Sequence, residues 1–116
     1  MRHNFLHLDI WKRSRKMVKN IYKATKSFPS EEKFGLTSQI RRAAISVPSN
    51  IAEGCGRDSD PQLKNFLNIA IGSICELETQ VYLAFDLEYL NQTATDMLVN
   101  EITIIRKMMM SFQKRL

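Results

Sequence analysis

The sequence predicts an all-α fold, a single-domain up-and-down four-helix bundle that spans residues 1–116. Four segments repeat apolar residues every three or four positions, which is the spacing of an amphipathic helix. Only four glycines and three prolines interrupt the chain, so long helices are expected. Signals for helix starts and ends fall between the four segments. Four such helices with short connections pack most simply as an antiparallel bundle.

The first helix is predicted from about Leu8 to Ser27, and it ends before Phe28-Pro29 because a residue that precedes proline favours extended geometry. Apolar side chains gather on one face of this helix, together with Thr25. They are Ile10, Trp11, Met17, Val18, Ile21, Tyr22 and Ala24. The opposite face is basic. It carries Lys12, Arg15, Lys16, Lys19, Lys23 and Lys26, and Arg13 adds a seventh cation.

The second helix is predicted over roughly Glu31 to Glu53, and it contains a proline. Its core stripe is Leu36, Ile40, Ala43, Val47 and Ile51. Pro48 cannot donate a hydrogen bond to the carbonyl of Ala44, and its ring crowds that carbonyl, so the helix is expected to bend there. Gly54 and Gly56 are expected to end the helix.

The third helix is predicted from Pro61 to about Leu90, after an N-cap at Ser59 or Asp60. Its core residues alternate spacings of four and three, which is the seam of a bundle. They are Leu63, Leu67, Ala70, Ile74, Leu77, Val81 and Ala84. A second apolar set exceeds what one seam can use, and it predicts subunit association. It consists of Phe66, Ile69, Ile71, Leu83, Phe85 and Leu87.

The fourth helix is predicted from Ala94 to about Lys114. Thr93 is the expected N-cap, and Asp96 takes the capping-box position. The buried residues of this helix are expected to be Leu98, Ile105, Met108 or Met109, and Phe112.

Charge is unevenly distributed along the chain, whose net charge is +5. Residues 1–57 carry twelve Lys/Arg and four Asp/Glu, whereas residues 58–101 carry one lysine and eight acids. This asymmetry indicates either polyanion binding or complementary faces between subunits. The seven cations of the first helix can track the phosphate backbone of RNA or DNA, or they can form an ordinary solvated face. Trp11 and Tyr22 fall on the apolar side, so base stacking is not indicated.

The second helix has a face of small polar residues, where a solvated face usually carries more Lys and Glu. This face comprises Gln39, Arg42, Ser46, Ser49, Asn50 and Glu53. We interpret it as a close-packed polar interface between helices or subunits. A ligand-binding site and an ordinary surface are the alternatives.

The sequence predicts neither an enzyme nor a cofactor, and it identifies no small-molecule substrate. Phosphate-binding glycine loops, GxSxG and HExxH are absent, and Glu76 and Glu78 point apart on one helix. His3 and His7 could touch one metal ion if their segment were helical, but a frayed basic terminus is the preferred interpretation and no metal is predicted.

The predicted location is the cytoplasm, with no membrane association. The chain begins without a secretory signal, and no apolar run approaches the roughly 18 residues of a transmembrane helix. Cys55 and Cys75 form neither a CxxC motif nor a metal cluster, which suits free thiols in a reducing compartment.

Three stretches of the chain carry a family resemblance: "FLHLDIW", "FPSEEKFGLTSQIRRAAISVPSNIAEGCGR" and "NFLNIAIGSICELETQ". They closely resemble the 23S rRNA intervening-sequence proteins, which are encoded in insertions within bacterial large-subunit ribosomal RNA genes and elsewhere in bacterial genomes. Arg41, Arg42, Pro48, Ser49, Asn50, Glu53 and Gly54 match the family pattern.

The resemblance implies a left-handed up-and-down bundle that assembles into a ring-shaped homopentamer. It also implies kinship with the accessory protein of diversity-generating retroelements, a basic pentameric barrel that binds its reverse transcriptase and nucleic acid. No catalytic role attaches to the matching residues. Two hypotheses therefore stand: a homo-oligomeric accessory protein that binds RNA or DNA through the basic face of the first helix, and a protein–protein scaffold without a nucleic-acid role.

Overall fold

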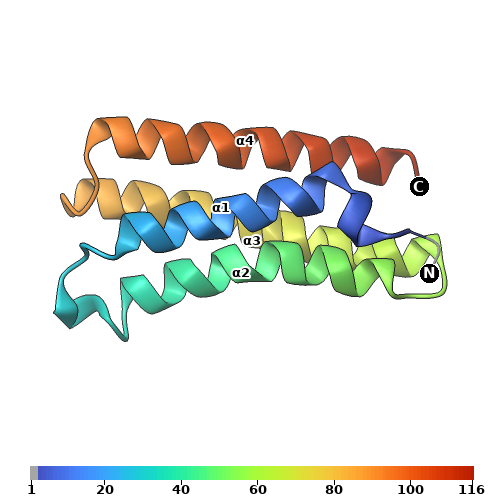
Figure 1. Ribbon diagram of the computed structural model, residues 1–116, viewed down its shortest axis with the longest axis horizontal. Coiled ribbons are helices and arrows are strands. Elements are labelled where there is room, and N and C mark those ends of the chain that lie inside the picture. The colour runs from blue at the N-terminus through green and yellow to red at the C-terminus, as the bar shows by residue number, and fades with distance from the viewer. Residues whose placement is uncertain (1–2) are drawn as a thin grey trace.

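Four long helices form one antiparallel bundle in the computed structural model, which describes residues 3–116 (Figure 1). They are α1 (Asp9–Thr25), α2 (Leu36–Cys55), α3 (Asp60–Asp86) and α4 (Gln92–Lys114), with short 3-10 turns η1 (Phe5–His7) and η2 (Ser30–Glu32). Consecutive helices pack against each other, and α4 closes the bundle against α1. The molecule measures 43 × 24 × 20 Å, and the described part contains no strand. The predicted fold class is confirmed.

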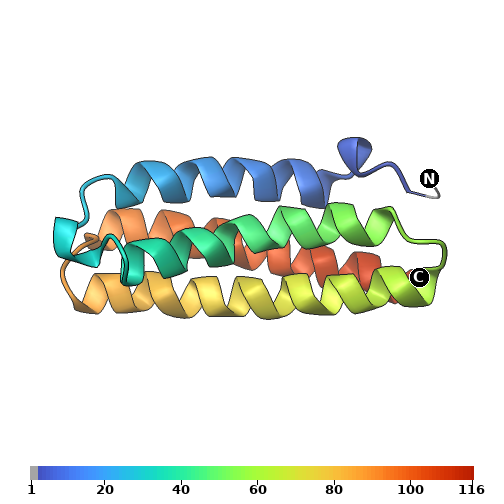
Figure 2. The ribbon, with the colours of Figure 1, turned by 90° about the horizontal axis from the view of Figure 1, so that it is seen from below.

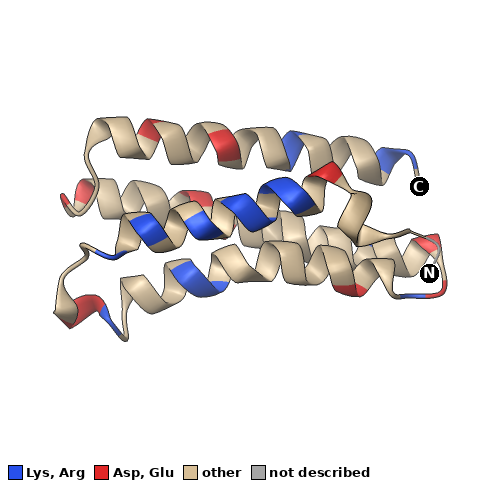
Figure 3. Cartoon of the chain, viewed as in Figure 1, with Lys and Arg blue, Asp and Glu red and all other residues tan. Residues whose placement is uncertain are grey.

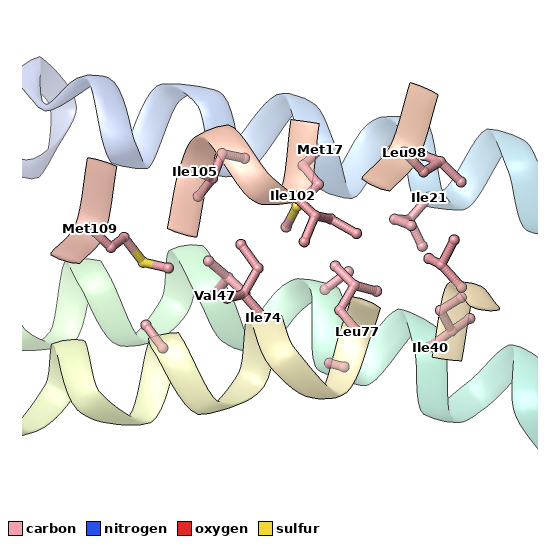
Figure 4. Packing of buried hydrophobic residues seen from close by; sticks show 14 of the residues in the cluster. Met17, Ile21, Ile40, Val47, Ile74, Leu77, Leu98, Ile102, Ile105 and Met109 are labelled. Carbon is pink, nitrogen blue, oxygen red and sulfur yellow. The ribbon is translucent and has the colours of Figure 1, made fainter. Parts of the chain in front are cut away.

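The core runs along the centre of the bundle, and α2 lies between α1 and α3 (Figure 2). All seven residues of the predicted α3 seam are buried. Figure 4 shows Ile74 and Leu77 of this seam pointing towards residues of the other helices, among them Met17 of α1 and Ile102 of α4. Ile102 is fully buried although the sequence analysis did not select it. Of the two alternatives in α4, Met109 is the buried methionine.

The second helix begins at Leu36, so its predicted start at Glu31 is wrong. Residues 30–32 form the separate turn η2. The Oε1 atom of Glu32 accepts a hydrogen bond of 3.0 Å from the N–H of Leu36, and Gly35 at the N-cap position has no side chain to cap the helix. This carboxylate satisfies one of the free N–H groups at the helix start.

The third helix ends at Asp86, four residues earlier than predicted. Glu88 has a φ of 65°, in the left-handed region. The N–H of Tyr89 donates to the carbonyl of Ala84 at 2.8 Å, and the N–H of Glu88 donates to that of Phe85 at 3.0 Å. These two bonds form a Schellman motif, which normally has glycine where Glu88 stands.

At the start of α3 a predicted N-cap is confirmed, and at the start of α4 the predicted N-cap is wrong. Ser59 caps α3, as one of the two predicted alternatives, and its hydroxyl accepts the N–H of Gln62 at 3.4 Å. Asn91 caps α4, and its side-chain oxygen accepts the N–H of Ala94 at 2.8 Å. The predicted cap, Thr93, lies inside the first turn of α4.

Pro48 lies inside α2, and the helix continues past it to Cys55; the bend at this position stays a prediction. Gly54 does not end the helix, which corrects the sequence analysis. A Cβ atom at Gly54 would lie 2.8 Å from both Leu63 Cδ1 and Phe66 Cβ, so glycine here lets α2 approach α3 closely. Gly56 is the C-cap, as expected.

The two cysteines are free and differ in exposure. Cys55 is buried at the end of α2, and burial raises the pKa of its thiol. Cys75 is exposed on α3. Across residues 3–116, none of the helices combines the length and the hydropathy needed to cross a membrane.

Candidate nucleic-acid and subunit interfaces

The seven basic residues predicted for the first helix all lie on its exposed side. Ile10, Met17 and Ile21 are buried on the opposite side of α1. Figure 3 shows the basic positions at successive turns of α1, on the side that faces the viewer. The exposed residues are Lys12, Arg13, Arg15, Lys16, Lys19, Lys23 and Lys26.

Five of these residues form a straight row along the helix, which we call the lysine ridge: Lys12, Lys16, Lys19, Lys23 and Lys26. Their spacing of four and three residues keeps them on one side of α1. At a rise of about 1.5 Å per residue, the row is about 21 Å long. None of the five forms an ion pair with another described residue. The ridge therefore presents five ammonium groups to solvent without neutralising partners in the described chain.

The two arginines beside the ridge are engaged with neighbouring side chains. Arg13 Nη1 lies 4.0 Å from Glu101 Oε1 on α4. The guanidinium of Arg15 lies over the ring of Trp11, 5.5 Å from its centroid, and that ring also meets Phe5 edge-on at 5.1 Å. The structure thus separates the predicted basic face into five lysines without an ion pair in the described part of the chain and two arginines with intramolecular contacts.

Arg41 links α2 to the end of α1, a role that the sequence analysis did not identify. Its Nε donates to Thr25 Oγ1 at 2.9 Å, and its Nη2 donates to the carbonyl of Tyr22 at 3.5 Å. Its guanidinium also lies 4.4 Å from the centroid of the Tyr22 ring. The available signal was Thr25, a polar residue on the apolar face of α1.

The small polar face of α2 divides into two parts. Ser46 and Asn50 are half-buried: the hydroxyls of Ser46 on α2 and Ser73 on α3 lie 2.7 Å apart, and Asn50 Nδ2 donates to the carbonyl of Ser46 within α2 at 2.8 Å. The other predicted members are exposed; they are Gln39, Arg42, Ser49 and Glu53. Ser46 thus makes a polar contact between α2 and α3, and the interface role of the whole face stays a prediction.

A shallow polar groove of about 200 Å³ runs between α2 and α3 beside this contact. Arg42 and Glu76 stand in its lining with Ser46 and Ser73. Glu53 lies outside the groove and pairs with Arg57 at 3.8 Å on the surface. The groove is small and open, and its lining mixes one cation with one anion.

Large apolar side chains remain exposed on the outward sides of α2 and α3. Ile69 is 51% exposed, Leu83 is 46% exposed and Leu87 is 52% exposed, all from the apolar set that exceeded the seam. Ile45 of α2 is 41% exposed. The other members of that set, Phe66, Ile71 and Phe85, are half-buried within the chain.

Glu32 and Tyr89 meet at the end of the bundle where α2 begins. Tyr89 donates its hydroxyl to Glu32 Oε2 at 2.8 Å, while Glu32 Oε1 holds the N–H of Leu36. The backbone hydrogen bond from Leu36, followed by the Tyr89 hydroxyl, lowers the pKa of Glu32. The hydrogen bond to Glu32 raises the pKa of Tyr89.

The two histidines have different surroundings: His3 contacts Asp60 and Phe112, and His7 is exposed. His3 Nε2 is 3.3 Å from Asp60 Oδ1, and its ring meets Phe112 at 5.8 Å. His7 is exposed at the end of η1. Over residues 3–116 the structure places no three His, Cys, Asp or Glu side chains close enough together to hold a metal ion.

Comparison with known proteins relates the chain to one family and to a solved fold. The family model described as 23S rRNA-intervening sequence protein matches residues 6–111. A crystal structure of a protein with unknown function from the S23 ribosomal protein family of Bacteroides thetaiotaomicron is 27% identical in sequence. The two structures superpose with a TM-score of 0.81, over 90% of this chain and 98% of the other. The search of curated proteins found no match.

Proposed function

Because the chain belongs to the family of 23S rRNA-intervening sequence proteins, whose model covers most of its length, we propose that it is a bacterial, cytoplasmic accessory protein that binds RNA or DNA. In this proposal the lysine ridge of α1 is the binding surface, and the protein acts as a homo-oligomer without catalysing a reaction. The observation that carries the proposal is the row of five ammonium groups on one side of α1 that pair with no acid among residues 3–116.

Electrostatics favours a polyanion over the alternative of a solvated face. No acidic side chain of the described residues pairs with a lysine of the ridge, so the positive potential of the ridge extends into solvent. A phosphate backbone releases condensed counterions when lysines bind it, which is the main source of sequence-independent affinity. The proposed mechanism is therefore multivalent contact with phosphates and not recognition of a base sequence.

The oligomeric part of the proposal rests on the outward sides of α2 and α3. Ile69 and Leu83 are each about half exposed, and they belong to the apolar set that exceeds what the seam of α3 uses. The family resemblance favours a ring of five copies. Such a ring would repeat the lysine ridge five times, and multivalency would raise the affinity for a long polyanion without any new contact.

Fluorescence anisotropy with labelled duplex DNA and structured RNA tests the binding proposal. The ridge variant replaces Lys16, Lys19 and Lys23 with Gln. The control variant replaces the exposed Lys33, Lys64 and Lys107 with Gln and changes the net charge equally. On DNA, three lost phosphate contacts should make the slope of log affinity against log salt shallower by about 2.7. Equal behaviour of both variants, or no binding by the wild type, contradicts the proposal.

Light scattering at micromolar concentration tests the oligomer. We expect a mass several times 13.5 kDa for the wild type. Ile69→Lys places a charge on the outward side of α3 and should lower the mass to that of one chain, with circular dichroism retained. A single-chain mass for the wild type refutes this part of the proposal.

The exposed apolar side chains also favour a second candidate function, a scaffold that binds another protein on the outward side of α2 and α3. Affinity capture after nuclease treatment distinguishes the two. A partner that is retained by the ridge variant and lost from Ser49→Lys, at an exposed position of the polar face, would support the scaffold. A partner that the wild type captures before but not after nuclease treatment, and that the ridge variant fails to capture, would support nucleic-acid binding.

A further inference from the structure

We infer that the nucleic acid on the lysine ridge is double-stranded and that the ridge holds its backbone without stacking on its bases. This inference rests on the proposed function and specifies the form of its ligand. Three observations carry it: the aromatic rings of α1 are covered, the lysines of the ridge follow one straight helix, and the neighbouring arginines contact other side chains.

The aromatic rings near the ridge are closed to nucleobases. Trp11 is half-buried between Phe5 and the guanidinium of Arg15. Tyr22 is half-buried under the guanidinium of Arg41. Proteins that bind single strands without sequence preference combine a basic surface with aromatic side chains on which successive bases stack. The surface of α1 supplies the first of these features and lacks the second.

The shape of the ridge suits a stiff polyanion. The five lysines start from backbone positions spaced along about 21 Å of α1 and its C-cap, and duplex DNA is straight over this distance because its persistence length is about 50 nm. A duplex also carries a charge about every 1.7 Å of its axis, twice the density of one of its strands. A flexible single strand would have to be ordered along the row, and no stacking contact on α1 would compensate for that loss of entropy.

The side chains of the ridge do not read bases. Lysine is a compact point charge, whereas the planar arginine fork makes the paired contacts that distinguish guanine in the major groove. The arginines beside the ridge are engaged: Arg13 faces Glu101, and Arg15 lies on Trp11. Backbone contact by lysines gives binding that depends on salt and on duplex form and little on sequence.

Phe34 provides a sharp internal test because its ring is 89% exposed. It lies in the connection between η2 and α2, outside the ridge, with the ammonium of Lys33 5.5 Å from its ring centroid. If single strands were the ligand, this ring would be the most exposed stacking platform among the described aromatic side chains, ahead of Tyr82, which is 45% exposed. Duplex binding through the ridge does not use it.

The experiment compares four labelled probes at one salt concentration: duplex DNA, duplex RNA, single-stranded DNA and oligo-uridine. Probes of about 20 nucleotides or base pairs exceed the roughly six base pairs that the ridge spans. We expect duplexes to bind roughly tenfold or more tightly than single strands. Triple replacement of Lys16, Lys19 and Lys23 by Gln should remove this preference, and Phe34→Ala should leave duplex affinity unchanged.

Two outcomes would overturn the inference while leaving the proposed function intact. One is equal or tighter binding of single strands with the same dependence on the ridge lysines. The other is a marked loss of affinity in Phe34→Ala. Absence of binding to all four probes, or binding that the ridge variant retains in full, would instead remove the proposed function and the inference together.

Discussion

The hydroxyl of Tyr89 donates a hydrogen bond of 2.8 Å to Glu32, 57 residues away in the sequence. The second oxygen of the same carboxylate accepts the N–H of Leu36, the first residue of α2. One carboxylate thus joins the segment after α3 to the start of α2. Its charge state couples the stability of this end of the bundle to pH.

We expect Glu32 to contribute stability that depends on pH with a definite sign. Its pKa is lowered in the folded protein, so its contribution is present above the ordinary value of 4.5 and is lost as pH falls through the lowered pKa. The variant Glu32→Gln removes the titrating group. In urea unfolding between pH 2 and 7, the difference in stability between wild type and variant should shrink as the solution becomes acidic.

Tyr89 should act at the alkaline end. Its pKa is raised above the ordinary 10.0, so its contribution is complete below that value and is lost as pH rises through the folded pKa. Tyr89→Phe should weaken the alkaline loss of stability and should also reduce the acid dependence attributed to Glu32. If Glu32→Gln and Tyr89→Phe both kept the wild-type dependence of stability on pH, the hydrogen bond between these residues would not form in solution.

Gly54→Ala should destabilise the bundle by about 1–3 kcal/mol, because the added methyl group would press on Leu63 and on the Cβ of Phe66. Gly72 is the matched control in the same pair of helices. Nothing lies within 4 Å of the Cβ position there, so Gly72→Ala should stabilise α3 by about 0.5–1 kcal/mol. Urea unfolding measures both. Stabilisation by both alanines would contradict the close approach of α2 and α3.

Glu88→Gly should stabilise the protein by about 1 kcal/mol. Glu88 is the one described residue other than glycine with positive φ, a conformation that costs a residue with a Cβ atom about 1–2 kcal/mol. Glu88→Ala is the control, because it removes the carboxylate near the C-terminus of α3 and retains the Cβ atom. Thermal unfolding should rank the glycine variant above the alanine variant; the reverse order would contradict the left-handed conformation.

Arg41→Lys should cost about 1–2 kcal/mol, although the charge is preserved. Lysine lacks the planar fork that contacts Thr25 Oγ1 and the Tyr22 carbonyl while covering the Tyr22 ring. The neighbouring Arg42 is exposed, so Arg42→Lys should change stability by less than about 0.5 kcal/mol. Chemical denaturation of the two variants side by side tests the difference. Equal effects would exclude a special role for Arg41.

The sequence predicted the helices and their buried faces well because burial repeats with the period of the helix. The α3 seam from Leu63 to Ala84 is buried at every predicted position. The same periodicity placed the lysine ridge opposite Met17 and Ile21, so the main candidate site was visible before the structure. The sequence could not predict whether Arg13 forms an ion pair, because its partner Glu101 is distant in the sequence.

Helix ends and single contacts were harder to predict, for identifiable reasons. The start of α2 depends on the Glu32 carboxylate, which acts across a turn on Leu36. The end of α3 depends on Glu88, a residue type that does not signal a left-handed cap. The sequence predicts a helix end at Gly54, because the close approach of Phe66, which explains the glycine, comes from another helix. Local patterns do not contain such tertiary information.

Because one cysteine is buried and the other is exposed, the unmodified protein can be labelled at a single thiol. Cys55 is buried and its thiol pKa is raised, so little reactive thiolate forms there near neutral pH, whereas Cys75 lies exposed on α3. A maleimide fluorophore should therefore attach to Cys75 alone, without mutagenesis. Energy transfer between differently labelled copies would then report how subunits meet and exchange, from a fixed reference point on the third helix.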